Sequence, residues 1–305
     1  MNFPEIAAAL REEIAGDVRL GEPMARHTTY RVGGPAALFC VLETMHDLTA
    51  AMHILEEIEL PWMVIGKGSN LLVSDTGYEG AALVLGREFK RHTADGETLR
   101  AGAASVLAHL VQESFNKGLA GLEWAVGIPG TLGGALAMNA GTRDGCIGQS
   151  VETVTMWIPG QGLSLIHGRD VVWEYRRSGL AGRGIILEAS LRAEQGDPLR
   201  IRAQMERNLR DRKATQPIGL PSAGSVFMNP PGDSAGRLIE SVGLKGTALG
   251  GARISTVHAN FIVNEGSATA ADIVGLIRKI QLTVKERCGV DLRPEIRFVG
   301  TFEEA

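Results

Sequence analysis

The stretch GLEWAVGIPGTLGGALAMNAG at residues 121–141 decides the fold. A loop of this kind leaves its backbone uncovered, so a ligand can approach closely and consecutive N–H groups can face a pyrophosphate. Pro129 interrupts the loop, whose glycines are Gly127, Gly130, Gly133, Gly134 and Gly141. We therefore interpret it as a loop that either turns the chain or binds an anion.

A second glycine segment, GKGSN, occupies residues 66–70. Apolar runs on either side, Trp62 to Ile65 and Leu71 to Val73, predict one strand before it and one after it. Ser69 and Asn70 supply a hydroxyl and an amide, the short donors expected where a second loop closes on the same anion. A Rossmann site would need a third glycine and a following helix, and GKGSN has neither. From spacing alone, two glycine-rich turns and a phosphate cradle are equally good interpretations.

Helical periodicity appears before each glycine segment. Apolar residues recur at helical spacing from Asp47 to Ile58, and again from Leu107 to Phe115 ahead of Gly118. A further apolar run, Ala81 to Leu85, predicts a strand between them. Short strands and turns are expected from residue 142 to about residue 193, so both helical and strand patterns occur along the chain.

A change of pattern marks a domain boundary. EQGDP at residues 194–198 predicts a linker that ends in a helix start, with Asp197 as N-cap and Pro198 at the first helical position. The helix that follows is rich in arginine. We place the boundary there, which gives domains at residues 1–196 and 197–305, the first with lobes of about 1–86 and 87–196.

The last part of the chain predicts a helix and then a strand. Thr269 and Asp272 predict a capping box, and the apolar stripe of the helix runs to Gly289. After it, residues 290–299 alternate strictly. This alternation predicts a strand with two faces, one carrying Val290, Leu292, Ile296 and Phe298 and the other Asp291, Arg293, Glu295 and Arg297.

Composition limits the classes of protein that fit. The chain has 305 residues, 44% of them hydrophobic, and a formal net charge of -4, so two folded domains are expected and broad attraction to nucleic acid is not. Three scattered cysteines suggest neither disulfides nor a zinc site, which fits a reducing cytoplasm. The N-terminus reads as an amphipathic helix and not as a secretory signal, and no apolar run is long enough to span a membrane. Common hydrolase, kinase and metalloprotease motifs are absent, and no metal site is expected.

Six motifs together resemble the UDP-N-acetylenolpyruvoylglucosamine reductase family. They cover nearly the whole chain in the family's order, from about residue 20 to residue 300. The motifs are HTTYRVGGPA at 27–36, GKGSNLLVSD at 66–75, GLEWAVGIPGTLGGALAMNAG at 121–141, YRRS at 175–178, PSAGSVFMNP at 221–230 and LRPEIRFVG at 292–300.

This resemblance implies an α+β fold. It would consist of a two-lobed FAD-binding domain of the vanillyl-alcohol-oxidase type and a C-terminal α+β substrate-binding domain. The implied activity is reduction of a UDP-sugar enolpyruvyl ether to UDP-N-acetylmuramate for peptidoglycan, with FAD as cofactor and NADPH as co-substrate. Partners other than this small-molecule substrate, such as nucleic acid or membrane, are not implied, and the oligomeric state is left open.

The resemblance also implies roles for particular residues. Arg176, Ser225 and Glu295 form the catalytic set. Asn229 and His258 match substrate-side positions. The residues expected to contact the flavin cofactor are Tyr30, Gly66, Lys67, Gly68, Ser69, Asn70, Leu71, Gly127, Ile128, Pro129, Gly130, Thr131, Gly133, Gly134, Asn139, Ala140, Gly141 and Ile186.

Those roles suit the chemistry. Hydride addition to a carbon–carbon double bond leaves negative charge on the neighbouring carbon and its carboxylate, and Arg176 is a permanent, forked cation that can stabilise it. Ser225 is expected to protonate the carbon. Glu295 helps only when protonated, which requires partial burial, and the predicted strand face places it beside Arg293 and Arg297.

The sequence departs from the family at several points. Met228 stands where family members often carry lysine, and Thr142, Arg143 and Asp144 replace a glycine-rich stretch. A tyrosine-bearing loop of one subgroup is missing, so the chain resembles the shorter subgroup. Two rival hypotheses are an FAD oxidase of the same fold and nucleic-acid binding by the arginine-rich helix from Pro198 to Lys213, for which a solvated face is the alternative.

Overall fold

The computed structural model describes residues 1–302, and these residues form two compact units. The first unit contains residues 1–18, 40–66 and 82–212, and the second contains residues 19–39, 67–81 and 213–305. The predicted boundary after residue 196 therefore does not coincide with the division into units. Two short N-terminal segments belong to the second unit because they pack with the C-terminal third of the chain.

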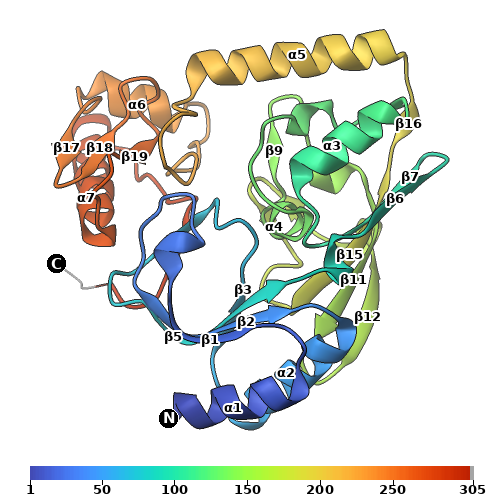
Figure 1. The fold of residues 1–305 in the computed structure, drawn as a ribbon. Helices are drawn as coiled ribbons and strands as arrows, with labels where there is room; N and C mark the ends of the chain where they lie inside the picture. The colour runs from blue at the N-terminus through green and yellow to red at the C-terminus, as the bar shows by residue number, and fades with distance from the viewer. Residues whose placement is uncertain (303–305) are drawn as a thin grey trace. The chain divides into compact units, whose positions relative to one another are not determined.

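The first unit is built around a five-stranded sheet of order β12-β11-β15-β7-β6, whose strands pair antiparallel (Figure 1). Its strands are β6 (His92–Asp95), β7 (Thr98–Gly102), β11 (Val151–Ile158), β12 (Gly162–His167) and β15 (Ile185–Arg192). Short pairs surround it: β8 (Leu119–Ala120) with β16 (Glu194–Gln195), β9 (Gly141–Thr142) with β10 (Gly145–Cys146), and β13 (Trp173–Glu174) with β14 (Arg177–Ser178).

Helices complete this unit. They are α1 (Phe3–Glu13), α2 (Met45–Glu57), α3 (Leu107–Asn116) and α4 (Leu132–Met138), with short 3-10 turns at η2 (Glu88–Lys90), η3 (Glu123–Ala125), η4 (Ile147–Gln149) and η5 (Gly168–Asp170). Helices α1 and α2 pack against each other. Asp47 links them, because its carboxylate accepts hydrogen bonds from the N–H groups of Ala15 and Glu43.

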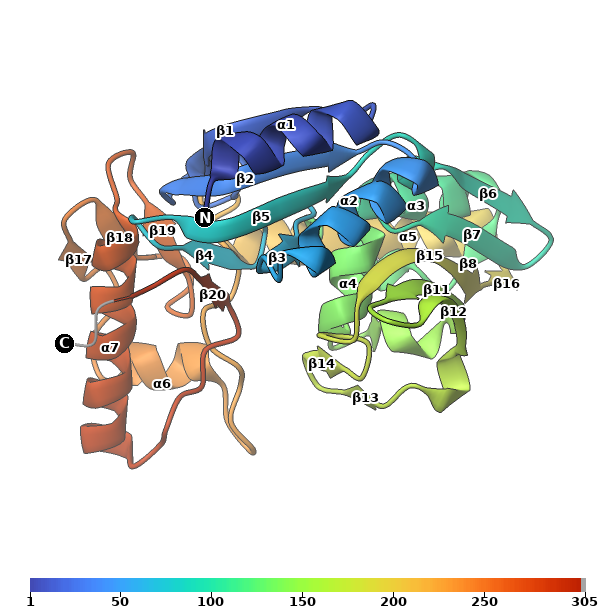
Figure 2. The ribbon, with the colours of Figure 1, turned by 90° about the horizontal axis from the view of Figure 1, so that it is seen from below.

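The second unit has its own core of buried side chains. Helix α7 (Ala270–Cys288) packs against α6 (Ala235–Ser241) and against the strands β17 (Ala248–Leu249) and β18 (Ala252–Ile254), as both views show (Figures 1 and 2). Strand β19 (Ile262–Asn264) completes that sheet, and β20 (Arg297–Val299) pairs parallel with β4 (Leu71–Val73). Tyr30 and Leu72 belong to the same core as the apolar face of α7.

One sheet contains three of the five points at which the chain changes unit. Its order is β1-β2-β5-β3, formed by β1 (Val18–Pro23), β2 (Pro35–Leu42), β5 (Tyr78–Leu85) and β3 (Trp62–Val64). The chain changes unit inside β1, inside β2 and inside β5. Between β1 and β2 lies a short 3-10 turn, η1 (Met24–Arg26).

Most elements expected from periodicity are confirmed. The capping box of Thr269 and Asp272 begins α7, and Gly289, with a φ of 71°, ends it. The side chain of Asp197 accepts a hydrogen bond from the N–H of Leu199 (2.9 Å) at the start of α5 (Pro198–Thr215). Exposed arginines of α5 lie near acidic residues of the same helix, as in the pair Arg202–Glu206 (3.9 Å).

Two expectations about local structure are wrong. The second glycine segment is not a continuous loop, because α4 occupies its second half. The strand expected over residues 290–299 is reduced to β20, and Phe298 is 41% exposed although its predicted face is apolar. Leu292 and Ile296 are buried as expected. Phe298 instead makes an edge contact with Phe302.

No helix among residues 1–302 is long and apolar enough to cross a membrane. Within the same residues, no group of three or more potential ligands could hold a metal ion.

Candidate active site

The first glycine segment turns tightly at Gly68. This residue has a φ of +60°, and a Cβ added to it would lie 2.1 Å from the carbonyl oxygen of His27. The N–H and hydroxyl of Thr29 both lie within hydrogen-bonding distance of the Gly68 carbonyl (3.3 and 3.4 Å). Only glycine fits such a position, so the segment is shaped by the HTTYRVGG loop behind it.

The two glycine segments meet at Gly66 and Thr131, which both belong to the first unit. A Cβ on Gly66 would come within 2.4 Å of the Thr131 hydroxyl oxygen. Thr131 is buried and caps α4, accepting a hydrogen bond from the N–H of Gly134 (3.4 Å). The structure thus brings together two segments that are more than sixty residues apart in sequence.

The expectation of consecutive free N–H groups in the second segment is wrong for its middle part. The N–H groups of Leu132 and Gly133 donate to the carbonyls of Ser105 (2.9 Å) and Ala103 (2.8 Å). These bonds fix the start of α4 to the loop that follows β7. The backbone at the start of α4 is therefore held by hydrogen bonds within the protein. The residues of this segment that stay exposed to a ligand include Gly127 and Gly134.

The far end of the second segment is held through Asn139. Its φ of 42° is left-handed, its Nδ2 donates to the carbonyl of Glu174 (2.8 Å), and its Oδ1 accepts from the N–H of Gly148 (3.1 Å). These bonds tie the helix end to the connection that carries Arg176.

Arg176 lies between β13 and β14, where its φ of 58° is unusual for a residue with a side chain. Its Nη1 donates to the carbonyl oxygen of Gly141 (2.7 Å), the last residue of the second glycine segment. Its guanidinium also lies 5.1 Å from the centre of the Tyr175 ring. The structure therefore brings the predicted catalytic cation to the predicted cofactor segment within the first unit.

Ser225 and Glu295 are brought together in the second unit. The residue after Ser225, Val226, accepts a hydrogen bond through its carbonyl from the N–H of Glu295 (2.7 Å). Phe227 and Pro294 form an antiparallel bridge next to it. Both residues are half-buried.

Asn70 connects this pair to the first glycine segment. Its Nδ2 donates to the carbonyl of Glu295 (3.1 Å), and its own carbonyl accepts from the N–H of Arg297 (2.8 Å). The parallel pairing of β20 with β4 continues from this point. Asn70 thus holds the backbone at Glu295 through its side chain and the backbone at Arg297 through its carbonyl.

The two predicted substrate-side residues both lie at the start of α6. Asn229 accepts a hydrogen bond from the N–H of Ala235 (3.0 Å). The ring of His258 lies against Gly236, so close that a Cβ added to this glycine would be 3.0 Å from the ring. Burial lowers the pKa of His258, and the nearby Lys245 lowers it further. A neutral imidazole is therefore favoured there at neutral pH.

Five of the predicted flavin contacts are buried: Gly68, Thr131 and Asn139 within the glycine segments, and Tyr30 and Ile186 outside them. The Tyr30 side chain is fully buried in the core of the second unit, and burial raises the pKa of its hydroxyl well above the ordinary value. Ile186 is buried in β15. Tyr30 is 0% exposed as a whole residue, and its carbonyl accepts a hydrogen bond from the Nδ2 of Asn264 (2.9 Å), so no atom of Tyr30 is accessible to a flavin in this arrangement.

The residues that depart from the family pattern also have defined places. Arg143, at the tip of the β9–β10 hairpin, donates to the carboxylate of Asp211 in α5 (3.0 Å). Thr142 accepts a hydrogen bond from the N–H of Asp144 (3.1 Å), which closes the hairpin turn. Met228 is half-buried, and its N–H donates to the carbonyl of Arg293 (3.0 Å).

Sequence reasoning missed Asn260, which holds the Ser225 loop in place. Asn260 is 3% exposed; its Oδ1 accepts from the N–H of Phe227 (3.0 Å), and its Nδ2 donates to the carbonyl of Phe227 (2.8 Å). Its carbonyl also accepts from the N–H of Val226. The sequence holds one signal for this role: Asn260 interrupts the apolar run after His258. An amide that is buried in such a run needs hydrogen-bond partners.

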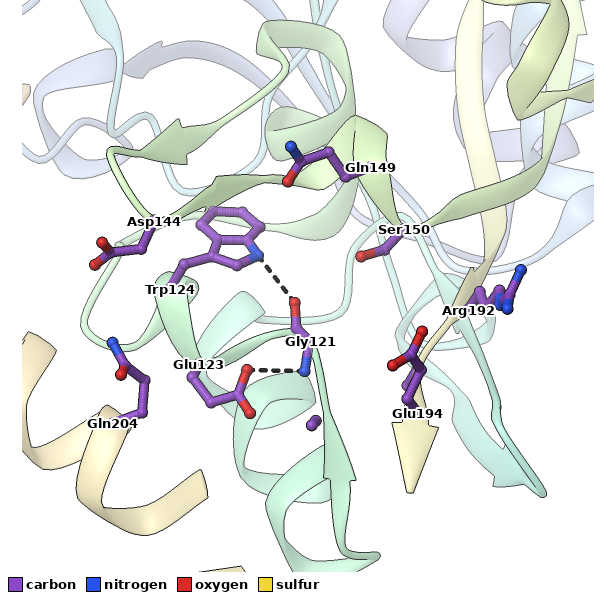
Figure 3. A pocket seen from close by; sticks show the side chains of 11 residues that line it. Gly121, Glu123, Trp124, Asp144, Gln149, Ser150, Arg192, Glu194 and Gln204 are labelled. Atoms are coloured by element: carbon purple, nitrogen blue, oxygen red, sulfur yellow. Dashed lines mark hydrogen bonds between the residues drawn. The ribbon is translucent and has the colours of Figure 1, made fainter. Parts of the chain in front are cut away.

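A cavity of about 720 Å³ in the first unit is separate from these residues. Its lining includes Trp124, Asp144, Arg192 and Glu194, drawn in Figure 3 together with the hydrogen bond from the Trp124 Nε1 to Gly121. None of the predicted catalytic, substrate or cofactor residues lines it. It is therefore not assigned to the reaction.

Comparison with known proteins identifies both parts of the chain. A family model described as FAD binding domain matches residues 36–161, and one described as UDP-N-acetylenolpyruvoylglucosamine reductase, C-terminal domain, matches residues 216–299. Wild-type Phl p 4.0202, a glucose dehydrogenase, aligns over 64% of this chain and 44% of its own, with TM-score 0.50 and 14% identity, which shows the fold alone. The chain is an FAD-dependent oxidoreductase with a two-lobed FAD-binding domain of the vanillyl-alcohol-oxidase type and a C-terminal α+β domain.

Full-length relatives give the family. UDP-N-acetylenolpyruvoylglucosamine reductase of Geobacter metallireducens is 43% identical over 297 residues, covering 97% of this chain and 98% of that protein. The enzyme of the same name from Heliobacterium modesticaldum is 43% identical over 285 residues, covering 92% and 90%. The crystal structure of the reductase from Thermus caldophilus has a TM-score of 0.82 at 36% identity and covers 94% of this chain and 100% of that chain. The chain belongs to the UDP-N-acetylenolpyruvoylglucosamine reductase family.

The residues of the glycine segments fit FAD. Gly66, Gly127 and Gly134 are exposed and carry no side chain, so a pyrophosphate could approach the backbone at these points. The N–H of Gly134 already donates to the Thr131 hydroxyl. Thr131 is buried between the two segments and holds their spacing. Lys67 is exposed and adds a positive charge to the first segment.

Proposed function

We infer that this chain reduces the enolpyruvyl group of UDP-N-acetylenolpyruvoylglucosamine to UDP-N-acetylmuramate, with NADPH as the reductant, in peptidoglycan biosynthesis. The observation that supports this most directly is the backbone hydrogen bond from Glu295 to Val226, the residue after Ser225, together with the bond from Asn70 to the carbonyl of Glu295. Two residues of the predicted catalytic set therefore lie on chain segments that are joined to each other and to Asn70. Residence in the cytoplasm belongs to the same proposal.

When bound, FAD would supply the hydride-transfer chemistry between NADPH and the methylene carbon of the substrate. The protein must then stabilise the negative charge left on the neighbouring carbon and its carboxylate. Arg176 is assigned to this carboxylate, because its guanidinium is permanently charged and has a planar set of donors. One well-placed donor of this kind contributes roughly 3 kcal/mol in the transition state.

Ser225 is assigned the proton transfer that completes the reduction. Its hydroxyl gives its proton to the carbon that carries the carboxylate, which balances the hydride added at the methylene carbon. Glu295, protonated, is assigned to hydrogen bonding at the developing enolate. The backbone bond between Val226 and Glu295 supports these joint roles, because it fixes the two residues at neighbouring positions.

Asn229 and His258 are assigned to the substrate. Both lie at the start of α6, in the second unit that also carries Ser225. The lowered pKa of His258 favours a neutral ring. Its Nδ1 already accepts a hydrogen bond from the N–H of Asn260 (3.1 Å), so its Nε2–H remains as a donor for a substrate oxygen.

The test follows the flavin colour. Purified protein is expected to show visible flavin absorbance that bleaches on anaerobic addition of NADPH and returns on addition of the enolpyruvyl UDP-sugar. A colourless protein that takes up no FAD would overturn the proposal. Rapid return of the colour in air, with no response to the UDP-sugar, would indicate an oxidase instead.

A further inference from the structure

A buried carboxylate lies at the base of the HTTYRVGG loop, outside the catalytic set. Glu22, near the end of β1, is 6% exposed, and its Oε1 lies 2.9 Å from the Nε2 of His27 and 3.3 Å from the Nη1 of Arg19. The hydrogen bond to His27 lowers the pKa of Glu22, and burial opposes it. Buried carboxylates are retained as ions only when such partners surround them.

The imidazole of His27 is held on a second side by an aromatic ring. Its centre lies 4.2 Å from the centre of the Phe39 ring, at an interplanar angle of 31°. Phe39 is buried in β2. The His27 ring is thus held between Glu22 and Phe39, and the N–H of the same residue donates to the carbonyl of Met24 (2.8 Å).

That backbone supports the first glycine segment. The carbonyl of His27 faces Gly68 so closely that a Cβ there would lie 2.1 Å from its oxygen. The N–H of Thr29, two residues further on, lies 3.3 Å from the Gly68 carbonyl. All these residues belong to the second unit.

The contacts continue from Gly68 to the backbone of Glu295, the residue that carries the predicted catalytic carboxyl. Two residues after Gly68, Asn70 donates its Nδ2 to the carbonyl of Glu295. A change in the orientation of His27 would therefore shift the segment that both binds the cofactor and holds Glu295. Partners of this kind, one step removed from a ligand, commonly set how well the contacting groups are oriented.

We propose that Glu22 is a positioning residue for the FAD-binding segment Gly66–Asn70, acting through the imidazole of His27. The inference rests on the proposed function, since it presumes that this segment holds FAD. Neither Glu22 nor His27 touches the reacting atoms in this arrangement. Their effect is on FAD affinity, and at saturating FAD it extends weakly to turnover.

The experiment measures the dissociation constant of FAD from the apoprotein by flavin fluorescence. The variants are E22A, E22Q, H27A and the double variant E22A/H27A. E22A and H27A are each expected to weaken FAD binding about tenfold, which corresponds to about 1.4 kcal/mol. The double variant is expected to be no weaker than either single variant, because both changes remove the same linkage.

Two further variants separate positioning from general destabilisation. E22Q retains an oxygen that can accept from the Nε2 of His27, so its FAD affinity is expected to stay within about threefold of the parent. E265A is the matched control, because Glu265 accepts a 2.8 Å hydrogen bond from Arg253 in the same unit and does not contact the glycine segment. Its FAD affinity is expected to be unchanged.

The outcomes are distinguishable. If the parent protein binds no FAD, the proposed function fails. If the parent binds FAD and E22A binds it equally well, or E22A lowers only the melting temperature, the inference about Glu22 alone is overturned. Additive losses in E22A and H27A also overturn it. If E22A does not fold, H27A and E22Q supply the same comparison: weak binding by H27A with near-parent binding by E22Q supports the linkage, and equal affinities overturn it.

Discussion

The two units hold their predicted catalytic residues by different means. In the first unit, Arg176 has a left-handed backbone, and its side chain donates to the carbonyl of Gly141. In the second unit, Ser225 and Glu295 are fixed by backbone pairing between their loops and by the buried amide of Asn260. Arg176 is therefore held through its side chain, whereas Ser225 and Glu295 are held through the backbone of their loops. Substitutions should therefore affect chemistry at Arg176 and Ser225, and folding at Asn260.

The largest effect is expected for Ser225→Ala. NADPH should still bleach the flavin, while reoxidation by the enolpyruvyl substrate should slow by about 10²–10⁴-fold, the usual contribution of a proton donor. Stopped-flow absorbance resolves the two half-reactions. Ser241→Ala, at the end of α6, is the control and should reoxidise at the parent rate. Normal reoxidation of the Ser225 variant would remove this hydroxyl from the mechanism.

The next effect concerns Arg176 and its neighbour Arg177. Lysine cannot reproduce the planar fork, so Arg176→Lys should slow flavin reoxidation by about a hundredfold, the loss typical of a missing oxyanion donor. Arg177 is exposed and lies 3.6 Å from Glu174, and Arg177→Lys should have little effect. The measurement is the reoxidation rate at saturating substrate. Equal rates for the two variants would show that Arg176 only supports the loop.

A third change tests the backbone-held half of the site. Asn260→Ala removes both side-chain bonds to Phe227 and leaves its buried N–H and carbonyl without that amide. The free energy of unfolding should fall by about 2–4 kcal/mol, because each unmet buried group costs about 1–3 kcal/mol. Urea unfolding measures this, with the exposed Asn116→Ala as control. A stable Asn260 variant would mean that backbone pairing alone holds the Ser225 loop.

The smallest expected effect is on the pH dependence of stability, which can be measured in each unit separately. Burial acts to raise the pKa values of Asp47 and Asp272, but hydrogen bonds to the two carboxylates outweigh burial, so both pKa values are lowered. The donors to Asp47 are Glu43, Ala15 and Thr44. The donors to Asp272 are Thr269 and Gly251. A lowered pKa in the folded state stabilises the protein above the unfolded pKa of about 4, and this stabilisation is lost as pH falls through the folded value.

Asp47→Asn and Asp272→Asn should each reduce the loss of stability at low pH in the unit that carries the substitution. The expected change is about 1 kcal/mol or less at neutral pH, the scale of one helix cap. Hydrogen exchange in α2 and in α7, compared between pH 6 and pH 3, measures each unit separately. Unchanged acid sensitivity in both variants would place the titrating groups elsewhere.

Part of the candidate site could be predicted from the sequence. The two glycine segments and the catalytic set came from motifs, and the structure brings Ser225 and Glu295 together as the family resemblance implies. Asn260 and the Glu22–His27 pair could not be found this way, because an amide and a lone carboxylate have no periodic pattern. Tyr30 was predicted as a flavin contact, and its side chain is buried in the core.

The sequence by itself determined most of the longer helices. Apolar spacing and caps gave α1, α2, α3, α5 and α7, because helix formation depends mainly on neighbours within four residues. Only the tertiary structure decided that α4 forms inside the second glycine segment, that residues 19–39 and 67–81 pack with the C-terminal third, and that Asn70 pairs with Glu295. Those outcomes depend on burial and hydrogen bonds between residues far apart in the chain, which no local pattern records.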